Sequence, residues 1–292
     1  MRDWILAARP KTLPASLAPV WVGSWLGASC AGVLRWDLAA WTLAGCLCLQ
    51  IATNLFNDAI DFRKGADTAR RLGPDRVTAQ GRLSPGQVIG GALALLGLAV
   101  VCGAVLFRER GWLVVAIGLP SLYLCYGYSG GPLPLAYRGL GELFVFLFFG
   151  LIAVAGSAFV QSGAWPADAW IAGAQTGLLS TALIAVNNLR DIEEDRASGK
   201  RTLAVRFGLR FGRLEILFLI AGCYLAGLLW LAADRPRAFW LPVAALPLGI
   251  VVARGVWAQA PGRIYNRFLA LSALQLLVFA LLLAATFSAG PR

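Results

Sequence analysis

The chain has 292 residues, of which 59% are hydrophobic and 14% are charged, and its formal net charge is +11. This composition is typical of an integral membrane protein and excludes an ordinary soluble domain. The basic residues flank apolar runs, where membrane topology and anionic lipid account for them, so we expect no nucleic-acid partner. The sequence contains no histidine, which excludes a His-based catalytic triad and His-ligated zinc or haem.

Nine apolar runs are long enough to cross the roughly 30 Å hydrocarbon core of a bilayer. Because no domain boundary separates them, they predict one all-α transmembrane domain over residues 1–292, built from nine helices. The predicted spans are Leu13–Leu34, Leu38–Phe56, Val88–Phe107, Trp112–Tyr128, Leu140–Gln161, Ala167–Leu189, Leu214–Ala233, Phe239–Val256 and Phe268–Phe287.

Lys and Arg are distributed unevenly between the segments that connect these spans. With the N-terminus in the cytoplasm, the inside segments hold 20 of the 26 Lys and Arg residues, and the outside segments hold 6. Because cytoplasmic loops are enriched in basic residues, the sequence predicts a cell-membrane protein with a cytoplasmic N-terminus and an outside C-terminus. The two acidic stretches considered next then lie on the cytoplasmic side.

The first polar stretch, Asn54–Asp67, begins where the second apolar run ends. Asn57 and Asp61 are four residues apart, so on a helix they share one face. Hard oxygen ligands at a helix end suit Mg²⁺, and Lys64 beside them suits a phosphate. A simpler alternative is that these juxtamembrane carboxylates merely pair with neighbouring basic residues.

The second polar stretch, Asn187–Thr202, repeats this arrangement after another apolar run. Asn187, Asp191 and Asp195 are spaced by four, which predicts that they fan over one side of a helix. Two such helix ends in matching positions predict a shared Mg²⁺ site that holds a phosphate-rich ligand. The basic residues beside this stretch, which are candidates for binding the phosphates, are Arg190, Lys200 and Arg201.

Three other segments reach the same predicted face. The basic residues of the N-terminal tail contact either lipid headgroups or substrate. The loop after the first polar stretch is long and charged, which predicts an ordered lid. The Gly- and Pro-rich loop Tyr128–Glu142 predicts a tight turn that forms one wall of a substrate pocket. The candidate substrate-binding residues in these segments are Arg9, Lys11, Arg76, Tyr137 and Arg138.

Two runs, NDAIDFRKGAD (Asn57–Asp67) and NNLRDIEEDRASGKRTLA (Asn187–Ala204), resemble the two signature motifs of the UbiA-type intramembrane prenyltransferases. ARPKTLPASLAPVWVG (Ala8–Gly23), RVTAQGRLSP (Arg76–Pro85) and GGPLPLAYRGLGE (Gly130–Glu142) are similar to the branch of this family that serves the menaquinone pathway. The resemblance extends from the N-terminal tail through the seventh span. It implies a nine-helix bundle with a cytoplasmic-side active site.

The resemblance also implies which residues act. Its first motif, N-x-x-x-D-x-x-x-D, would place the last acid at Gly65, and the nearest later acid is Asp67. Asp58, which follows Asn54 by four residues, is the alternative ligand. The implied Mg²⁺ ligands are Asn57, Asp61, Asp67, Asp191, Asp195 and, as the alternative, Asp58. The implied catalytic residues are Asn57, Asp61, Asn187 and Asp191.

The activity implied by this resemblance is transfer of a polyprenyl group from polyprenyl diphosphate to 1,4-dihydroxy-2-naphthoate. Diphosphate and carbon dioxide are lost, the product is demethylmenaquinol, and Mg²⁺ and membrane lipid are the other partners. Arg76 is favoured as the residue that holds the acceptor carboxylate. The same chemistry on 4-hydroxybenzoate, homogentisate or a tetrapyrrole is one alternative. A lipid or ion transporter without enzymatic activity is the other.

Overall fold

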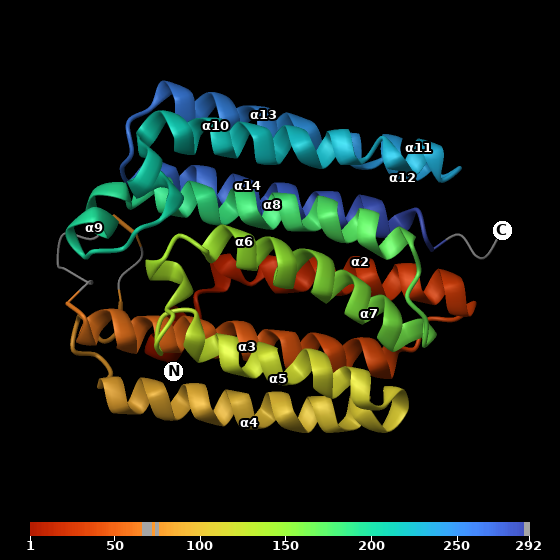
Figure 1. Ribbon diagram of the computed structural model, residues 1–292, viewed down its shortest axis with the longest axis horizontal. Coiled ribbons are helices and arrows are strands. Elements are labelled where there is room, and N and C mark those ends of the chain that lie inside the picture. The colour runs from red at the N-terminus through yellow and green to blue at the C-terminus, as the bar shows by residue number, and fades with distance from the viewer. Residues whose placement is uncertain (66–71, 74–75, 289–292) are drawn as a thin grey trace.

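The computed structural model describes residues 1–65, 72–73 and 76–288. Over these residues the chain forms a bundle of long helices that run roughly antiparallel to one another, joined at their ends by short helices and turns (Figure 1). The elements in chain order are α1 (Arg2–Ala8), η1 (Pro10–Thr12), α2 (Pro14–Ala31), α3 (Trp36–Arg63), α4 (Pro85–Arg110), α5 (Trp112–Gly127), η2 (Leu135–Tyr137), α6 (Gly141–Phe146), η3 (Leu147–Ile152), α7 (Ala153–Ser162), α8 (Asp168–Arg190), α9 (Ile192–Ala197), α10 (Leu203–Ala226), α11 (Leu229–Ala232), α12 (Pro236–Trp240), η4 (Pro242–Ala245), α13 (Leu246–Ala258) and α14 (Tyr265–Ala285).

Each predicted apolar run is helical, but the predicted count of nine spans is not confirmed. Within the described residues, seven helices are long and apolar enough to cross a membrane, and α5 is apolar but shorter. The helix α2 has 18 residues and carries Pro14 at its start and Pro19 inside it. The seven candidate spans are Trp36–Arg63, Pro85–Arg110, Gly141–Ser162, Asp168–Arg190, Leu203–Ala232, Pro236–Ala258 and Tyr265–Ala285.

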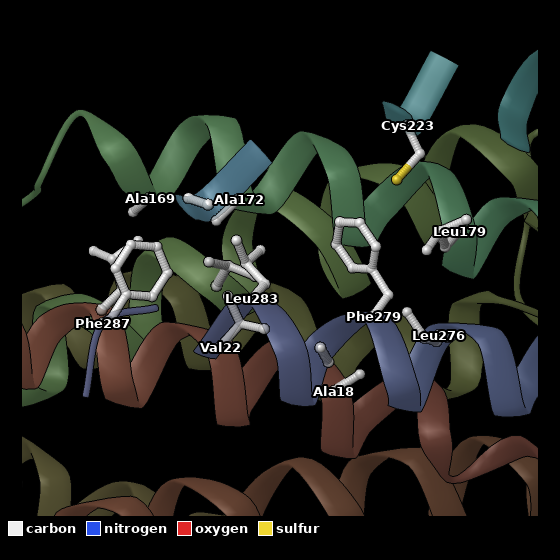
Figure 2. Packing of buried hydrophobic residues seen from close by; sticks show 14 of the residues in the cluster. Ala18, Val22, Ala169, Ala172, Leu179, Cys223, Leu276, Phe279, Leu283 and Phe287 are labelled. Carbon is white, nitrogen blue, oxygen red and sulfur yellow. The ribbon is translucent and has the colours of Figure 1, made fainter. Parts of the chain in front are cut away.

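The core of the bundle depends on small residues that let helices approach closely. Gly23 of α2 faces α7, and a Cβ added there would lie 2.3 Å from the Val154 carbonyl oxygen. Gly150 of η3 approaches Gly177 of α8 in the same way, at 2.4 Å. Close backbone contact of this kind stabilises helix pairs in lipid, where the hydrophobic effect between helices is weak. Figure 2 shows side chains of α2, α8 and α14 meeting at this core, among them Val22, Phe279 and Leu283.

The ends of α3 and α8 fix the position of the two polar stretches. α3 continues seven residues past the apolar run, to Arg63, so Asn57 and Asp61 lie on a helix as predicted. α8 ends at Arg190 and α9 begins at Ile192, so the prediction of one unbroken helix through the second stretch is wrong. The Asp191 N–H still bonds to the Asn187 carbonyl, and the Asp195 N–H bonds to the Asp191 carbonyl. Helical i to i−4 hydrogen bonding therefore links the three polar residues despite the break.

Candidate active site

A polar cavity lies between the C-terminal ends of α3 and α8, which are at the same end of the bundle (Figure 1). Residues from α3, α6, α8 and α9, the N-terminal segment and the loop after α3 line it. The structure therefore brings together the two polar stretches, which are about 130 residues apart in sequence. The predicted site residues that line this cavity are Arg9, Asn57, Arg76, Asn187, Asp191, Asp195 and Lys200.

In the first motif, Asp61 is the centre of a buried set of contacts. Its side chain is 1% exposed. The Tyr137 hydroxyl donates to Oδ1 at 2.8 Å, and Arg76 Nη2 and Lys200 Nζ donate to Oδ2 at 3.2 and 3.0 Å. Arg76 also donates to Asn57 Oδ1 at 3.2 Å. Two cations thus compensate a carboxylate that would otherwise be strongly disfavoured in a buried position.

In the second motif, Arg190 organises the polar side chains. Its Nε and Nη2 donate to both oxygens of Asp191, each at 2.6 Å, and both residues are buried. Nη2 also donates to Asn187 Oδ1 at 2.9 Å, and Nη1 to Asn266 Oδ1 at 2.7 Å. This bidentate geometry fixes Asp191 at the edge of the cavity.

Lys200 connects the two motifs. Its ammonium lies 3.0 Å from Asp61 Oδ2 and 3.7 Å from Asp195 Oδ1. Carboxylate oxygens from both motifs therefore converge on one cation. Within the described part of the chain, no three acidic or cysteine side chains form a ready-made metal cluster. The side chains that meet here offer oxygen atoms, the kind of donor that a hard divalent ion such as Mg²⁺ prefers.

The described part of the loop after α3 contributes Arg76 to the cavity lining and contacts Asp58. The Val77 and Thr78 N–H groups donate to the Asp58 carboxylate at 3.3 Å each, and the Thr78 hydroxyl donates to it as well. Leu72 is held from the other side, by Glu194 on its N–H and Asn266 on its carbonyl. The described residues of this loop are thus anchored to α3, α9 and α14, and its role as an ordered lid stays a prediction.

Asp58 and Asn54 have structural contacts rather than open ligand positions. Neither Asp58 nor Asp61 lines the polar cavity, but the Asp58 carboxylate is bound by backbone N–H groups of the loop, whereas the Asp61 carboxylate is bound by Arg76 and Lys200, which do line it. Asn54 lines the cavity, but its Nδ2 donates to the Ala8 carbonyl and the Thr12 hydroxyl, which fixes the N-terminal segment. These contacts argue against the alternative in which the first motif is counted from Asn54 and Asp58 is its metal ligand.

The remaining predicted residues lie around the opening. Lys64 donates to the Ser129 carbonyl at 2.8 Å and stands 3.8 Å from the centroid of the Tyr137 ring. Burial lowers the pKa of Lys64, and Asp61 partly opposes this shift. The side chains of Lys11, Arg138 and Arg201 are exposed and do not line the cavity. Asp67 lies outside the described residues.

Sequence reasoning missed several polar residues that line the cavity. Gln50 interrupts an apolar run, which is itself a signal of function in a membrane span. Ser180 and Asn188 carry no comparable signal. Glu142 ends the loop that was predicted to form a pocket wall, but it was not predicted as a binding residue, and the packing of α6 against α8 places it in the cavity. Gln50 Oε1 and Ser180 Oγ are buried and have no hydrogen-bond partner among the described residues.

An apolar chamber continues the polar cavity toward the middle of the bundle. It lies between α3, α4, α5 and the helix formed by α6, η3 and α7, and its walls include Leu49, Phe144 and Phe148. Both spaces share one set of wall residues, which we call the junction. The junction residues are Gln50, Thr53, Tyr128, Val145 and Phe149. The polar cavity and the apolar chamber therefore adjoin at the junction.

Comparisons with known proteins place this geometry among membrane prenyltransferases. The sequence profile of the UbiA prenyltransferase family matches residues 16–277. The 1,4-dihydroxy-2-naphthoate octaprenyltransferase of Bacillus subtilis (strain 168) is 36% identical over 270 residues, which is 86% of each chain. The enzyme of the same name from Mycobacterium tuberculosis is 35% identical over 295 residues, 99% of this chain and 97% of the relative.

The fold has solved counterparts as well. The structure of a UbiA homolog from Archaeoglobus fulgidus bound to GPP and Mg²⁺ superposes with a TM-score of 0.65 at 16% sequence identity. The superposition covers 96% of this chain and 99% of that one. The helical architecture is therefore shared over almost the whole length.

Proposed function

This chain belongs to the UbiA prenyltransferase family, and from that premise we propose that it prenylates 1,4-dihydroxy-2-naphthoate. A polyprenyl diphosphate supplies the prenyl group, diphosphate and carbon dioxide are released, and demethylmenaquinol is formed. The observation that carries the proposal is that a polar cavity and an apolar chamber adjoin and share the five junction residues. The naphthoate specificity is supported by relatives of that name, which are 34–36% identical to this chain over most of its length.

The diphosphate head is assigned to the polar cavity. Asp61, Asp191 and Asp195, with the amides of Asn57 and Asn187, would hold Mg²⁺, and Asp67 remains a further candidate. Bound Mg²⁺ would neutralise diphosphate charge and improve it as a leaving group, and the A. fulgidus homolog carries both Mg²⁺ and GPP. Of the basic residues expected to bind the phosphates, Lys200 lines the cavity and would meet the phosphate oxygens, whereas Lys64, Arg190 and Arg201 do not line it.

The prenyl tail is assigned to the apolar chamber. The Phe144 and Phe148 rings, stacked with centroids 5.6 Å apart, stand in its wall. Phe149 belongs to the junction, next to the position where the allylic carbon would lie. Aromatic faces stabilise an allylic cation by cation–π attraction, and the apolar wall excludes water from it.

The acceptor is assigned to the space between the lid and the junction. Arg76 belongs to the lid, lines the polar cavity and is 4% exposed. A guanidinium there can hold the acceptor carboxylate bidentately. Arg9 lines the same cavity from the N-terminal segment and is the second candidate for this contact. Tyr137, which donates to Asp61, would position the metal end instead.

The bundle orientation follows from the basic residues. We assign α2 and α5 as two further spans, which gives nine in all, with the N-terminus and the site on the cytoplasmic side. The central packing of α2 against α7, α8 and α14 supports its place among the spans. A thiol-reactive reagent that cannot cross membranes tests the orientation. Lys11→Cys should resist labelling in intact cells, whereas Arg237→Cys should react.

The activity test uses purified enzyme in lipid nanodiscs. Polyprenyl diphosphate, 1,4-dihydroxy-2-naphthoate and Mg²⁺ should give a prenylated, decarboxylated product, and a chelator should stop its formation. 4-Hydroxybenzoate and homogentisate, supplied in parallel, should give none. Product only from another acceptor would overturn the naphthoate assignment. Failure to consume prenyl diphosphate with any acceptor would favour the transporter alternative.

A further inference from the structure

Glu142 is a buried carboxylate in the polar cavity that the metal and phosphate assignments leave unused. Its side chain lines the cavity and is 4% exposed. Asn188 Nδ2 donates to Glu142 Oε1 at 2.7 Å, and this is its one hydrogen bond among the described residues. Three other acids of the site, Asp61, Asp191 and Asp195, contrast with it, because each contacts a Lys or Arg.

The position of Glu142 on its helix places it beside the reacting end of the substrates. Glu142 and Val145 are three residues apart on α6, so they lie near one another on its surface, and Phe149 follows in the π-helical segment η3. All three line the polar cavity, and Val145 and Phe149 are junction residues. The carboxylate therefore lies one helical turn from the boundary where head and tail of a prenyl diphosphate would meet.

Carboxylates that lack a cationic partner are costly to bury, which makes their retention informative. An amide donor such as Asn188 orients a carboxylate without neutralising it. The second oxygen of Glu142 is left to accept a hydrogen bond from a ligand in the cavity. A hydroxyl group of an aromatic acceptor is such a donor, whereas a diphosphate head would be repelled by the negative charge.

We propose that Glu142 is a catalytic residue that accepts the proton of the acceptor hydroxyl next to the ring carbon that is prenylated. The inference rests on the proposed function, because it requires a hydroxyl beside the carboxylate-bearing carbon. That carbon forms the new C–C bond while the allylic C–O bond to diphosphate breaks. The neighbouring hydroxyl becomes a carbonyl, and its proton moves to Glu142.

The same carboxyl then returns the proton. The prenylated intermediate is a β-keto acid. The bond between its ring carbon and the carboxylate breaks, carbon dioxide leaves, and the electrons of this bond form an enolate. The enolate oxygen takes the proton from Glu142, which restores the aromatic diol and the carboxylate. No oxidant or further reactant is needed, and Glu142 ends in the state in which it began. Asn188 acts in this scheme as a positioning residue.

The test separates ionisation of the prenyl diphosphate from transfer to the acceptor. Prenyl diphosphate with ¹⁸O in the bridging position scrambles this label when the C–O bond breaks and reforms. With acceptor present, Glu142→Gln should lower product formation by about 100-fold or more, the range of general-base catalysis. Label scrambling should stay within about threefold of wild type, the size of a neutral change.

The matched control is Glu215→Gln. Glu215 of α10 is near enough to Glu142 to interact electrostatically, but it does not line the polar cavity. Its substitution should leave both product formation and scrambling within about threefold of wild type. Equal loss of transfer and scrambling in Glu142→Gln would place Glu142 with the diphosphate head and overturn the inference, as would unimpaired transfer.

Two further outcomes keep the test decisive. If Glu142→Gln does not fold, wild-type enzyme is given the acceptor with that hydroxyl methylated. The analogue should permit scrambling without transfer, and transfer at the normal rate would overturn the inference. Absence of product from wild-type enzyme and the normal acceptor would overturn the proposed function itself, which is a different result from an active but Glu142-independent enzyme.

Discussion

The two N-x-x-x-D motifs look alike in sequence but are assembled in different ways. The second is local, because Asp191 and Asn187 are both held by Arg190 of the same segment. The first is tertiary, since Asp61 receives its donors from Arg76, Tyr137 and Lys200, which come from three other segments. The carboxylate of the second motif is therefore fixed by its own helix end, whereas that of the first depends on the lid and two loops.

This difference suggests a division of labour. A locally fixed carboxylate can remain in place throughout turnover. A carboxylate whose partners belong to the lid and to Lys200 changes its surroundings whenever those segments move. We therefore expect substitutions in the second motif to affect folding as well as activity, and substitutions around the first motif to affect activity mainly.

The largest effect is expected from Asp61→Ala and Asp191→Ala. Each should lower turnover on the order of 10³-fold, because each removes an oxygen that stabilises the charged diphosphate end. Asp191→Ala should also lower the free energy of unfolding by about 3–5 kcal/mol, since it leaves the buried Arg190 without its carboxylate. Asp61→Ala should lower the free energy of unfolding less. In this variant Lys200 still pairs with Asp195, and Arg76 still donates a hydrogen bond to Asn57.

Product formation and thermal unfolding in one detergent measure both quantities. Asp37→Ala is the control, because Asp37 forms an exposed ion pair with Arg35 outside the cavity. It should change stability by about 1 kcal/mol at most. Near-normal turnover in either motif variant would remove its metal role, and equal stability losses would remove the contrast between the motifs.

Next in size is Arg76→Ala, which tests the lid side of the first motif. Loss of a bidentate contact to the acceptor carboxylate should weaken acceptor affinity by roughly 30- to 1000-fold, or 2–4 kcal/mol. Affinity for prenyl diphosphate should change far less. Separate titrations of the two substrates decide this, with Arg82→Ala as the control, because Arg82 belongs to the same lid but pairs with Asp3 at the surface. Loss confined to prenyl diphosphate would move Arg76 to the head group.

A smaller effect is expected at the basic residues that serve the head. Lys200→Gln should raise the KM for prenyl diphosphate or lower turnover by about 10- to 100-fold, as loss of a charged hydrogen bond does. Lys64→Gln should cause a smaller loss, because Lys64 is exposed but contacts the Tyr137 ring. Arg201→Gln should stay within about threefold, because its side chain is exposed and does not line the cavity. Arg237→Gln, near the other end of the bundle, should change nothing. If all four variants had equal effects, these basic residues would serve only to set the membrane topology, not to bind the diphosphate.

The smallest effect concerns pH. The pKa of Lys64 is lowered from 10.5 by burial, so its ammonium is lost at a lower pH than that of an ordinary lysine. The KM for prenyl diphosphate should therefore rise on an alkaline limb that begins below pH 10.5. In the same window the folded state binds fewer protons than the unfolded state, so the contribution of Lys64 to the free energy of unfolding increases with pH. Lys64→Arg should abolish this alkaline rise in the pH profile of KM. If the rise were unchanged, a group other than Lys64 would be responsible for it.

The sequence by itself determined the helices and the chemistry. An apolar run of about 20 residues in lipid can satisfy its backbone groups only within its own helix, so each run predicted a helix wherever the others packed. The spacing of Asn57 and Asp61 likewise predicted a shared face, because helical geometry is local. The oxygen donors beside basic residues predicted the kind of ligand before their partners were known.

Only the tertiary structure decided which of these residues meet. Asp58 and Asp61 are three residues apart and equally acidic, but the lid backbone binds the first while Lys200 and Arg76 bind the second. Glu142 reads in the sequence as one charge in a turn, and it becomes a cavity residue because α6 packs against α8. The physical reason is that periodicity fixes the direction of a side chain on its own helix, whereas its partner depends on close packing between segments far apart in the chain.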